Sequence, residues 1–367
     1  MLKLGFLFLT LFSLGIHAQF ECSEHAIAGD DIILPSFTGK LNLKNGLKMT
    51  FGELIAMGDF YGIVNTPISE AENQEGRKER FLNAFNLLAT KPEAVSEASS
   101  IVSAIRCPKN TDETPRQRAQ KWNCLTGGGC SNLAWWTSPG RYLLLAKKNY
   151  DHFGDNAISA YIAGHEAALE EAAHGVLEKA YAMDAFACHF LTDHFASGHI
   201  RTPRIELPKH VTPAVVGSLL SGFMHNEECA LGLHVHNPRG DHWVAYGDGR
   251  YLDPLNQDNR RMMKQAIQAS VDDVYEAYVT GQNPANYTAL SLIPQADDHG
   301  PEGRTDIAPM FYWDAAGKRL MRRNHLSDPY DYTWSPHWLG WSTLAELQAL
   351  KVFSSSEIDL DMFMEMD

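Results

Sequence analysis

Residues 157–199 read AISAYIAGHEAALEEAAHGVLEKAYAMDAFACHFLTDHFASGH, and this segment carries the strongest fold signal in the chain. It is dense in Ala, Leu and Glu, which favour helices, and it contains no proline. Gly164 and Gly175 are its only glycines before residue 198. We therefore expect one or two long helices here, and Pro203 should end them.

Three metal-ligating side chains lie at the end of this segment. His189 and Asp193 are four residues apart, so a helix places them on one face, where both can bind one ion. His199 follows six residues later on another face, and a helix break at Ser197-Gly198 would return it to the site. A single histidine in such a helix is usually a core residue, but burying His, Asp and His without a cation is costly. The pattern predicts two neighbouring metals that share Asp193.

The remaining sequence adds shorter helices and one hairpin. Residues 107–140 are rich in Gly, Pro, Asn and Thr and are predicted to form a long loop. The apolar runs 231–236 and 242–246 flank NPRGD, which predicts a β-hairpin. Helical spacing recurs at residues 45–55, 77–105 with a break at Pro92, 215–229 and 259–279. The predicted fold is mainly α: a multi-helix bundle at residues 19–285, a hairpin insertion at 231–246, and a C-terminal extension at 286–367 of unknown role.

Composition limits the classes of partner. The chain has 367 residues and a formal charge of −14, which excludes the basic surface that duplex DNA or an anionic membrane attracts. No nucleic-acid partner is expected. Sixteen histidines accompany 45 carboxylates, and these side chains bind divalent cations. Positive charge for a phosphate substrate would then come from metal ions.

The N-terminus predicts export. Residues 1–18 combine one lysine, a 13-residue apolar run and a small residue at the end, as in a secretory signal peptide. All six cysteines follow this segment, an even count compatible with disulfides. Cys124 and Cys130 flank a glycine turn and could pair with each other. Cys188 and Cys229 could form a bridge or remain two buried thiols. The expected product is a secreted protein without a membrane anchor.

Around these residues the sequence resembles the bacterial zinc metallophospholipases C, whose superfamily includes the single-strand-specific fungal nucleases. The family pattern is His, three residues, Asp, five residues, His, and His189, Asp193 and His199 keep both spacings. The segments GDFYG at 58–62, DHFG at 151–154 and GDHWVAYGD at 240–248 add to the likeness. Together the matching segments scatter over residues 25 to about 280.

The resemblance implies a centre of two or three zinc ions. The first ion would take Asp59, His152, His189 and Asp193, the second His199, His225 and Glu228, and the third His25 with Asp193 as the bridge. Two positions depart from the family. Members commonly bind the third zinc with an N-terminal Trp, where cleavage here leaves Gln19. The last His–Glu pair is usually four apart, and Cys229 stands four residues after His225.

The implied activity is that of a secreted zinc-dependent phospholipase C. Metal-bound hydroxide would attack phospholipids such as phosphatidylcholine and release diacylglycerol and a phosphorylated head group. Asp59 is the expected additional proton acceptor, and the enzyme would contact membranes peripherally. One alternative is a zinc-dependent nuclease or phosphodiesterase on the same metals, with Trp135, Trp136 or Trp243 as platforms for bases. The other alternative is an exported zinc-binding module without turnover.

The other histidines have different expected roles. Structural or surface roles are expected for His165 and His174, and His194 should be exposed or close to the ligands. Three histidines of the hairpin could meet across its strands, although hairpin faces are often solvated: His234, His236 and His242.

Overall fold

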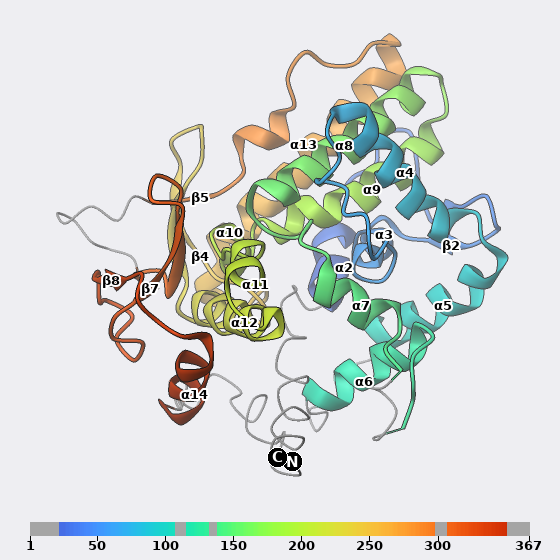
Figure 1. Cartoon of the computed structure of the whole chain (residues 1–367). Helices are drawn as coiled ribbons and strands as arrows, with labels where there is room; N and C mark the ends of the chain where they lie inside the picture. The colour runs from blue at the N-terminus through green and yellow to red at the C-terminus, as the bar shows by residue number, and fades with distance from the viewer. Residues whose placement is uncertain (1–21, 107–114, 132–137, 298–306, 351–367) are drawn as a thin grey trace.

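The computed structural model describes residues 22–106, 115–131, 138–297 and 307–350. Helices account for most of these residues and the strands are short, so the predicted mainly α fold is confirmed (Figure 1). The predicted signal peptide and the candidate platforms Trp135 and Trp136 lie outside the described residues. Among the described residues, no helix has the length and apolar character needed to cross a bilayer.

Two antiparallel helices form the centre of the molecule. The 157–197 segment folds as α8 (Gly154–Ala173) and α9 (Leu177–Asp193), which pack along each other. Gly175 ends α8 with a φ of 84°, a conformation that glycine adopts without steric cost. Almost every side chain of α9 is buried, because α8, α13 (Gln257–Thr280) and α3 (Phe51–Ile55) surround it. Its small alanines allow these helices to approach closely.

The N-terminal segment packs against α9. It contains α2 (Cys22–Asp30), the two-stranded β1 (Leu41–Asn42) and β2 (Lys48–Met49), α3 (Phe51–Ile55) and the 3₁₀ helix η1 (Ala56–Asp59). The predicted helix at 45–55 is therefore wrong in its first half. Thr50 starts α3 through a capping box with Glu53, and this cap outweighs the helical spacing of the preceding residues.

The next elements confirm one prediction and correct another. α4 (Gln74–Ala89) and α5 (Pro92–Arg106) are separated before Pro92, as predicted. The predicted long loop at 107–140 is wrong in part, because α6 (Pro115–Leu125) lies within it and α7 (Arg141–Lys148) follows. Proline is tolerated at the first position of a helix, and Pro115 occupies that position in α6. Cys124 and Cys130 form a disulfide after α6.

The second half of the chain begins with three helices and a small sheet. α10 (Ser197–Ile200), α11 (Glu206–His210) and α12 (Ala214–Leu231) lead into the antiparallel hairpin of β3 (Leu233–His236) and β4 (His242–Ala245). The predicted helix at 215–229 and the predicted hairpin are confirmed. The 3₁₀ helix η2 (Pro254–Asn256) precedes α13, which confirms the helix predicted at 259–279. After η3 (Thr288–Ser291), β5 (Gln295–Ala296) pairs with β3.

The C-terminal region packs against α12 and forms a second core. It contains a sheet of β6 (Phe311–Asp314), β7 (Arg319–Arg323) and β8 (Trp334–Ser335), followed by α14 (Gly340–Leu350). Figure 1 shows this sheet, in red, beside α11 and α12. Apolar side chains of α11, α12, β6, β7 and α14 bury one another there. α12 therefore packs against α10 on one side and against the C-terminal region on the other.

Candidate metal centre

Histidines and aspartates from distant parts of the chain meet near the end of α9. Three groups of metal-ligating side chains are each close enough to hold an ion. The first group is Asp59, His152 and His189; the second is His199, His225 and Asp248; and the third is His25, His189 and Asp193. All of these residues except Asp248 are buried. Seven of the eight predicted ligands therefore meet in these groups.

The first group lies beside Asp193, and short distances connect the four side chains. Asp193 Oδ2 lies 2.6 Å from His152 Nδ1 and 3.2 Å from His189 Nε2, and the two histidine nitrogens are 3.0 Å apart. Asp59 Oδ1 lies 3.7 Å from His189 Nε2. Donors of a tetrahedral zinc with bonds of about 2.0–2.1 Å are about 3.3 Å apart. These four side chains are the predicted first set, and the distances among Asp193, His152 and His189 suit a zinc site.

The second group is oriented by hydrogen bonds on the far side of each imidazole. His199 Nδ1 donates to the carbonyl of His152 at 2.8 Å, so its Nε2 carries a lone pair. His225 Nδ1 lies 2.9 Å from Asn226 Oδ1, and its Nε2 lies 3.5 Å from Asp248 Oδ2. Both rings are thus held with Nε2 available for a metal, as in many zinc proteins.

The third group uses the other oxygen of Asp193. The Thr192 hydroxyl donates to the carbonyl of Cys188 at 2.9 Å and therefore accepts from His25 Nδ1 at 2.8 Å. His25 Nε2 then faces Asp193 Oδ1 at 3.3 Å. Asp193 Oδ2 faces His152 and His189, so the two oxygens of this one carboxylate contact two different donor groups. This geometry is what a bridging ligand requires.

Glu228 is the predicted ligand that the structure places outside the three groups. Its Oε1 lies 2.7 Å from Arg201 Nε, because α10 ends with this guanidinium against α12. Asp248 stands with His199 and His225 instead. Helical spacing from His225 could not identify Asp248, which lies beyond the hairpin. The GDHWVAYGD segment did contain it, so the sequence held a signal for this residue.

Gly58 sets the distance between η1 and α9. A Cβ atom at this position would collide with the ring of His189. Glycine therefore lets the η1 backbone approach α9 closely, and the next residue, Asp59, comes within reach of His189. The segment GDFYG owes its first residue to this contact.

Burial and neighbouring charges shift the pKa values of the side chains in the metal centre. Burial raises the pKa of Asp59 to about 6 and lowers the pKa values of His199 and His225 to about 3 and about 4. Burial alone would raise the pKa of Asp193, but His189 and His152 outweigh it and the pKa falls well below its ordinary value. For His25 and His152, burial lowers the pKa, but the hydrogen bond and charge of Asp193 outweigh burial and raise it. The imidazoles of His199 and His225 are therefore neutral near pH 7, which is the protonation state that a metal ligand needs.

Several buried polar atoms in this centre lack a hydrogen-bond partner among the described residues. They include His199 Nε2, Asp193 Oδ1 and both carboxylate oxygens of Asp59. Buried polar atoms without partners are costly unless an ion or another group satisfies them. The donor set, its spacing and these atoms therefore fit a divalent cation.

Access to the centre is expected at Asp248, whose side chain is 17% exposed. The backbone after it is held by Glu24, whose carboxylate accepts from the amides of Gly249 and Tyr251 at 3.1 and 2.9 Å. Leu252 and Leu255 follow and are 64% and 63% exposed. The segment that follows Asp248, residues 249–256, therefore carries two exposed leucines, and we call it the rim loop.

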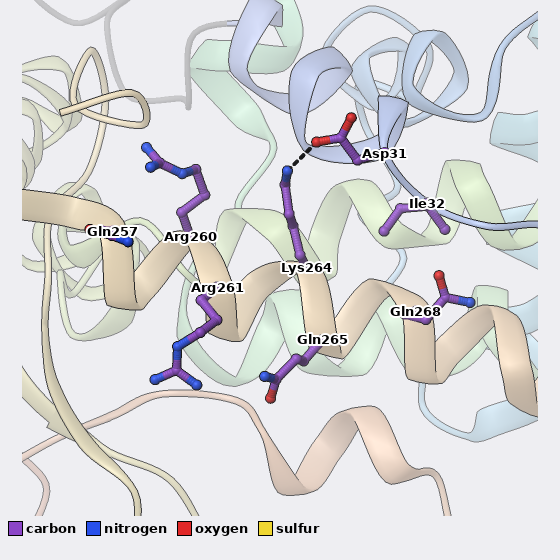
Figure 2. Close-up of a pocket in the computed structure, with 8 residues that line it drawn as sticks. All are labelled: Asp31, Ile32, Gln257, Arg260, Arg261, Lys264, Gln265 and Gln268. Carbon is purple, nitrogen blue, oxygen red and sulfur yellow. Dashed lines mark hydrogen bonds and ion pairs between the residues drawn. The ribbon is translucent and has the colours of Figure 1, made fainter. Parts of the chain in front are cut away.

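A separate pocket of about 500 Å³ lies on the outer side of α13 (Figure 2). Figure 2 shows Lys264 reaching Asp31, with which it forms an ion pair, while Arg260 and Arg261 lie nearer the start of the helix. None of the eight predicted ligands lines this pocket. It is therefore distinct from the metal centre.

The structure confirms some of the predictions for the remaining histidines and cysteines and contradicts others. His165 is buried beside Asp184, as a structural role predicts, and His174 is exposed. Of the two alternatives for His194, exposure is wrong, because the side chain is buried and its Nε2 lies 3.1 Å from the Pro294 carbonyl. The cysteines for which a bridge was considered are two buried thiols, Cys188 and Cys229.

The chain matches no protein-family model, no curated protein and no solved structure. Evidence on function therefore comes from the centre itself. Its main features are the shared carboxylate of Asp193, the oriented imidazoles and the partly exposed Asp248.

Proposed function

We propose that this chain is a secreted zinc-dependent phospholipase C. It would hydrolyse the glycerol–phosphate bond of phospholipids such as phosphatidylcholine to diacylglycerol and a phosphorylated head group. The observation that carries the proposal is the convergence of three donor groups, each of which contains Asp193 or a side chain within 4.0 Å of it. A structural zinc site is usually a closed set of four ligands, whereas adjoining groups favour a catalytic cluster.

The donor chemistry favours zinc. Imidazole nitrogens and carboxylate oxygens at near-tetrahedral spacing suit Zn²⁺, and magnesium or calcium would require mostly oxygen donors. When bound, zinc would neutralise phosphoryl oxygens and make a nucleophilic water available near neutral pH. This supply of positive charge reconciles a phosphate substrate with a chain of charge −14.

The protein side chains have distinct roles in this proposal. Asp193 would hold neighbouring ions at a set distance through its two oxygens. The Asp59 carboxylate would accept a proton from the attacking water, and its raised pKa of about 6 suits proton uptake near neutral pH. The hydrogen bonds of His199 and His225 keep their rings in place during turnover.

The rim loop supports a lipid substrate over a nucleic acid. Leu252 and Leu255 are exposed and follow Asp248, the partly exposed residue of the centre, by four and seven residues in the sequence. Exposed leucines can enter the interfacial region of a bilayer, and this would bring the phosphoester bond to Asp248. The acidic composition disfavours a polyanionic chain as the substrate.

A substrate panel tests the proposed function. The purified full chain would be offered a chromogenic phosphocholine ester, phosphatidylcholine vesicles and single-stranded DNA, each with and without a chelator. Diacylglycerol release that the chelator abolishes is the expected result. Cleavage of DNA alone would replace the proposal with a nuclease, and retention of zinc without turnover would replace it with a binding module.

A matched pair of variants connects activity to the centre. Asp193→Asn should lose metal and reduce turnover by more than about 100-fold, because the shared ligand is weakened. Asp258→Asn removes one exposed carboxylate of a surface ion pair with Arg261 and should change neither quantity. Full activity and full zinc content in Asp193→Asn would refute the shared-ligand assignment.

A further inference from the structure

The β3–β4 hairpin places two histidines directly opposite each other. His236 pairs with His242 across the antiparallel strands, and their ring centroids are 5.7 Å apart. β5 lies on the other side of β3, and Asp297 follows it. The Asp297 amide donates to the carbonyl of His234 at 3.0 Å, which fixes the backbone of Asp297 beside the histidine pair.

The Asp297 carboxylate lies between the two imidazoles. Its Oδ1 is 2.7 Å from His236 Nδ1 and 3.9 Å from His242 Nδ1. Donors of a tetrahedral zinc are about 3.3 Å apart, so both carboxylate–imidazole distances are within about 0.6 Å of that value. The two imidazole nitrogens are less close than the donors of the three groups in the metal centre, so His242 must rotate for all three side chains to bind one ion. The His242 side chain is 68% exposed and can rotate toward the carboxylate without repacking the core.

We propose that His236, His242 and Asp297 form a second, surface site for a divalent cation of the zinc type. Two imidazoles and one carboxylate are the ligands that such ions take, and water would complete the coordination. Metal binding would replace the proton shared between His236 Nδ1 and Asp297 Oδ1. Its occupancy does not depend on the proposed phospholipase activity.

This site lies on the opposite face of the hairpin from the interior. Trp243 alternates with His242 along β4, and it is buried with its Nε1 donating to Asn259 on α13. His236 and His242 therefore face away from α13. β3 lies between β4 and β5 in this sheet, and Figure 1 shows the sheet at the edge of the helical body, away from α3. The surface site is thus separate from the metal centre.

Occupancy would connect two parts of the chain that are far apart in sequence. A metal held by Asp297 and the histidine pair would cross-link the residue after β5 to the hairpin. Because the ligands are already close in the folded chain and far apart in the unfolded chain, binding should stabilise the fold. The stabilisation should disappear when both imidazoles are removed.

Zinc stoichiometry tests the surface site. The purified full chain would be titrated with zinc against a chromophoric chelator, alongside a His236→Gln/His242→Gln variant and a His174→Gln control. His174 is an exposed histidine on another element, so its loss removes an imidazole without touching the hairpin. The expected result is one zinc ion fewer in the double variant only, with the ions of the centre retained. Equal stoichiometry and affinity in all three proteins would overturn the proposal.

Chemical modification of histidines tests zinc binding at the surface site independently of stoichiometry. Diethylpyrocarbonate should modify His242 in the zinc-free chain, and zinc should block this modification while His174 remains reactive. Undiminished modification of His242 at saturating zinc would also overturn the site. Asp193→Asn should retain the surface ion, so a failure of the catalytic centre and a failure of this site are distinguishable.

Discussion

Asp193 shows how much a single side chain contributes to this protein. The four-residue spacing from His189 predicted that both would share one face, and the structure places Oδ2 of Asp193 3.2 Å from His189 Nε2. Its second oxygen faces His25, which is 168 residues away in sequence. No local pattern contains that second contact, because it depends on α2 packing against α9.

The roles of Asp248 and Glu228 can be separated by substitution. Asp248→Asn should lower the metal content by one ion and reduce turnover by about 10–100-fold, since a ligand carboxylate becomes a weaker amide donor. Glu228→Gln should keep the metal and instead weaken the packing of α10 on α12, because Arg201 loses its partner. Elemental analysis of both variants decides between them, and loss of metal in Glu228→Gln alone would restore the sequence prediction.

At the scale of elements, a buried polar network joins α8, α9 and α13. His165 Nδ1 lies 2.7 Å from Asp184 Oδ1, and Asp273 approaches its Nε2 at 3.7 Å. The Ser270 hydroxyl donates to Asp184 at 2.8 Å. Helical periodicity predicted the three helices, but it could not show that His165 and the two aspartates face one another. That outcome depends on how the helices are rotated about their axes.

This network should make stability pH-dependent. Burial lowers the pKa of His165, but the hydrogen bond and charge of Asp184 outweigh it and the folded-state pKa is raised to about 9. The stabilisation is fully present below the unfolded pKa of about 6.5 and is lost as the pH rises through about 9. A shift of this size corresponds to roughly 3 kcal/mol.

Urea unfolding in chelator, from pH 6 to pH 10, measures this effect. The free energy of unfolding should fall more steeply with pH in the unmodified chain than in His165→Gln. Parallel pH profiles for the two proteins would contradict the assignment. Other buried histidines titrate in both proteins, so the difference between the profiles isolates His165.

The rim loop should matter only at a lipid surface. Leu252→Glu and Leu255→Glu should each reduce hydrolysis of vesicles by about tenfold, because a charged side chain opposes insertion into the interface. Hydrolysis of the soluble chromogenic ester should stay the same. Val279→Glu is the matched control, since Val279 is equally exposed at the far end of α13. Equal losses on both substrates would indicate damage to the centre instead.

At the scale of the whole molecule, one buried ion pair connects the C-terminal region to the helix of the metal centre. Arg323 of β7 donates to both Glu227 oxygens at 2.7 and 2.9 Å, and both side chains are fully buried. Glu227 lies between His225 and Glu228 on α12. The C-terminal sheet therefore supports the helix that carries one of the candidate ligands.

Breaking this pair should destabilise the protein strongly. Arg323→Met leaves Glu227 buried without its guanidinium, and we expect a loss of about 3–5 kcal/mol in the free energy of unfolding. Arg319→Met, on the same strand, removes an exposed pair with Asp314 and should cost less than about 1 kcal/mol. Equal effects of the two substitutions in urea unfolding would rule out a special role for Arg323.

Local patterns were sufficient for most of the long helices, the hairpin and the pairing of His189 with Asp193, but not for α6 or for the start of α3. Each of these depends on relations within a few residues, which helix and strand periods specify directly. Packing decided that Asp248 joins His199 and His225, that His194 is buried, and that Cys188 and Cys229 stay reduced. These relations join residues far apart along the chain. Their distances follow from the rotation and approach of whole helices, which no short stretch of sequence encodes.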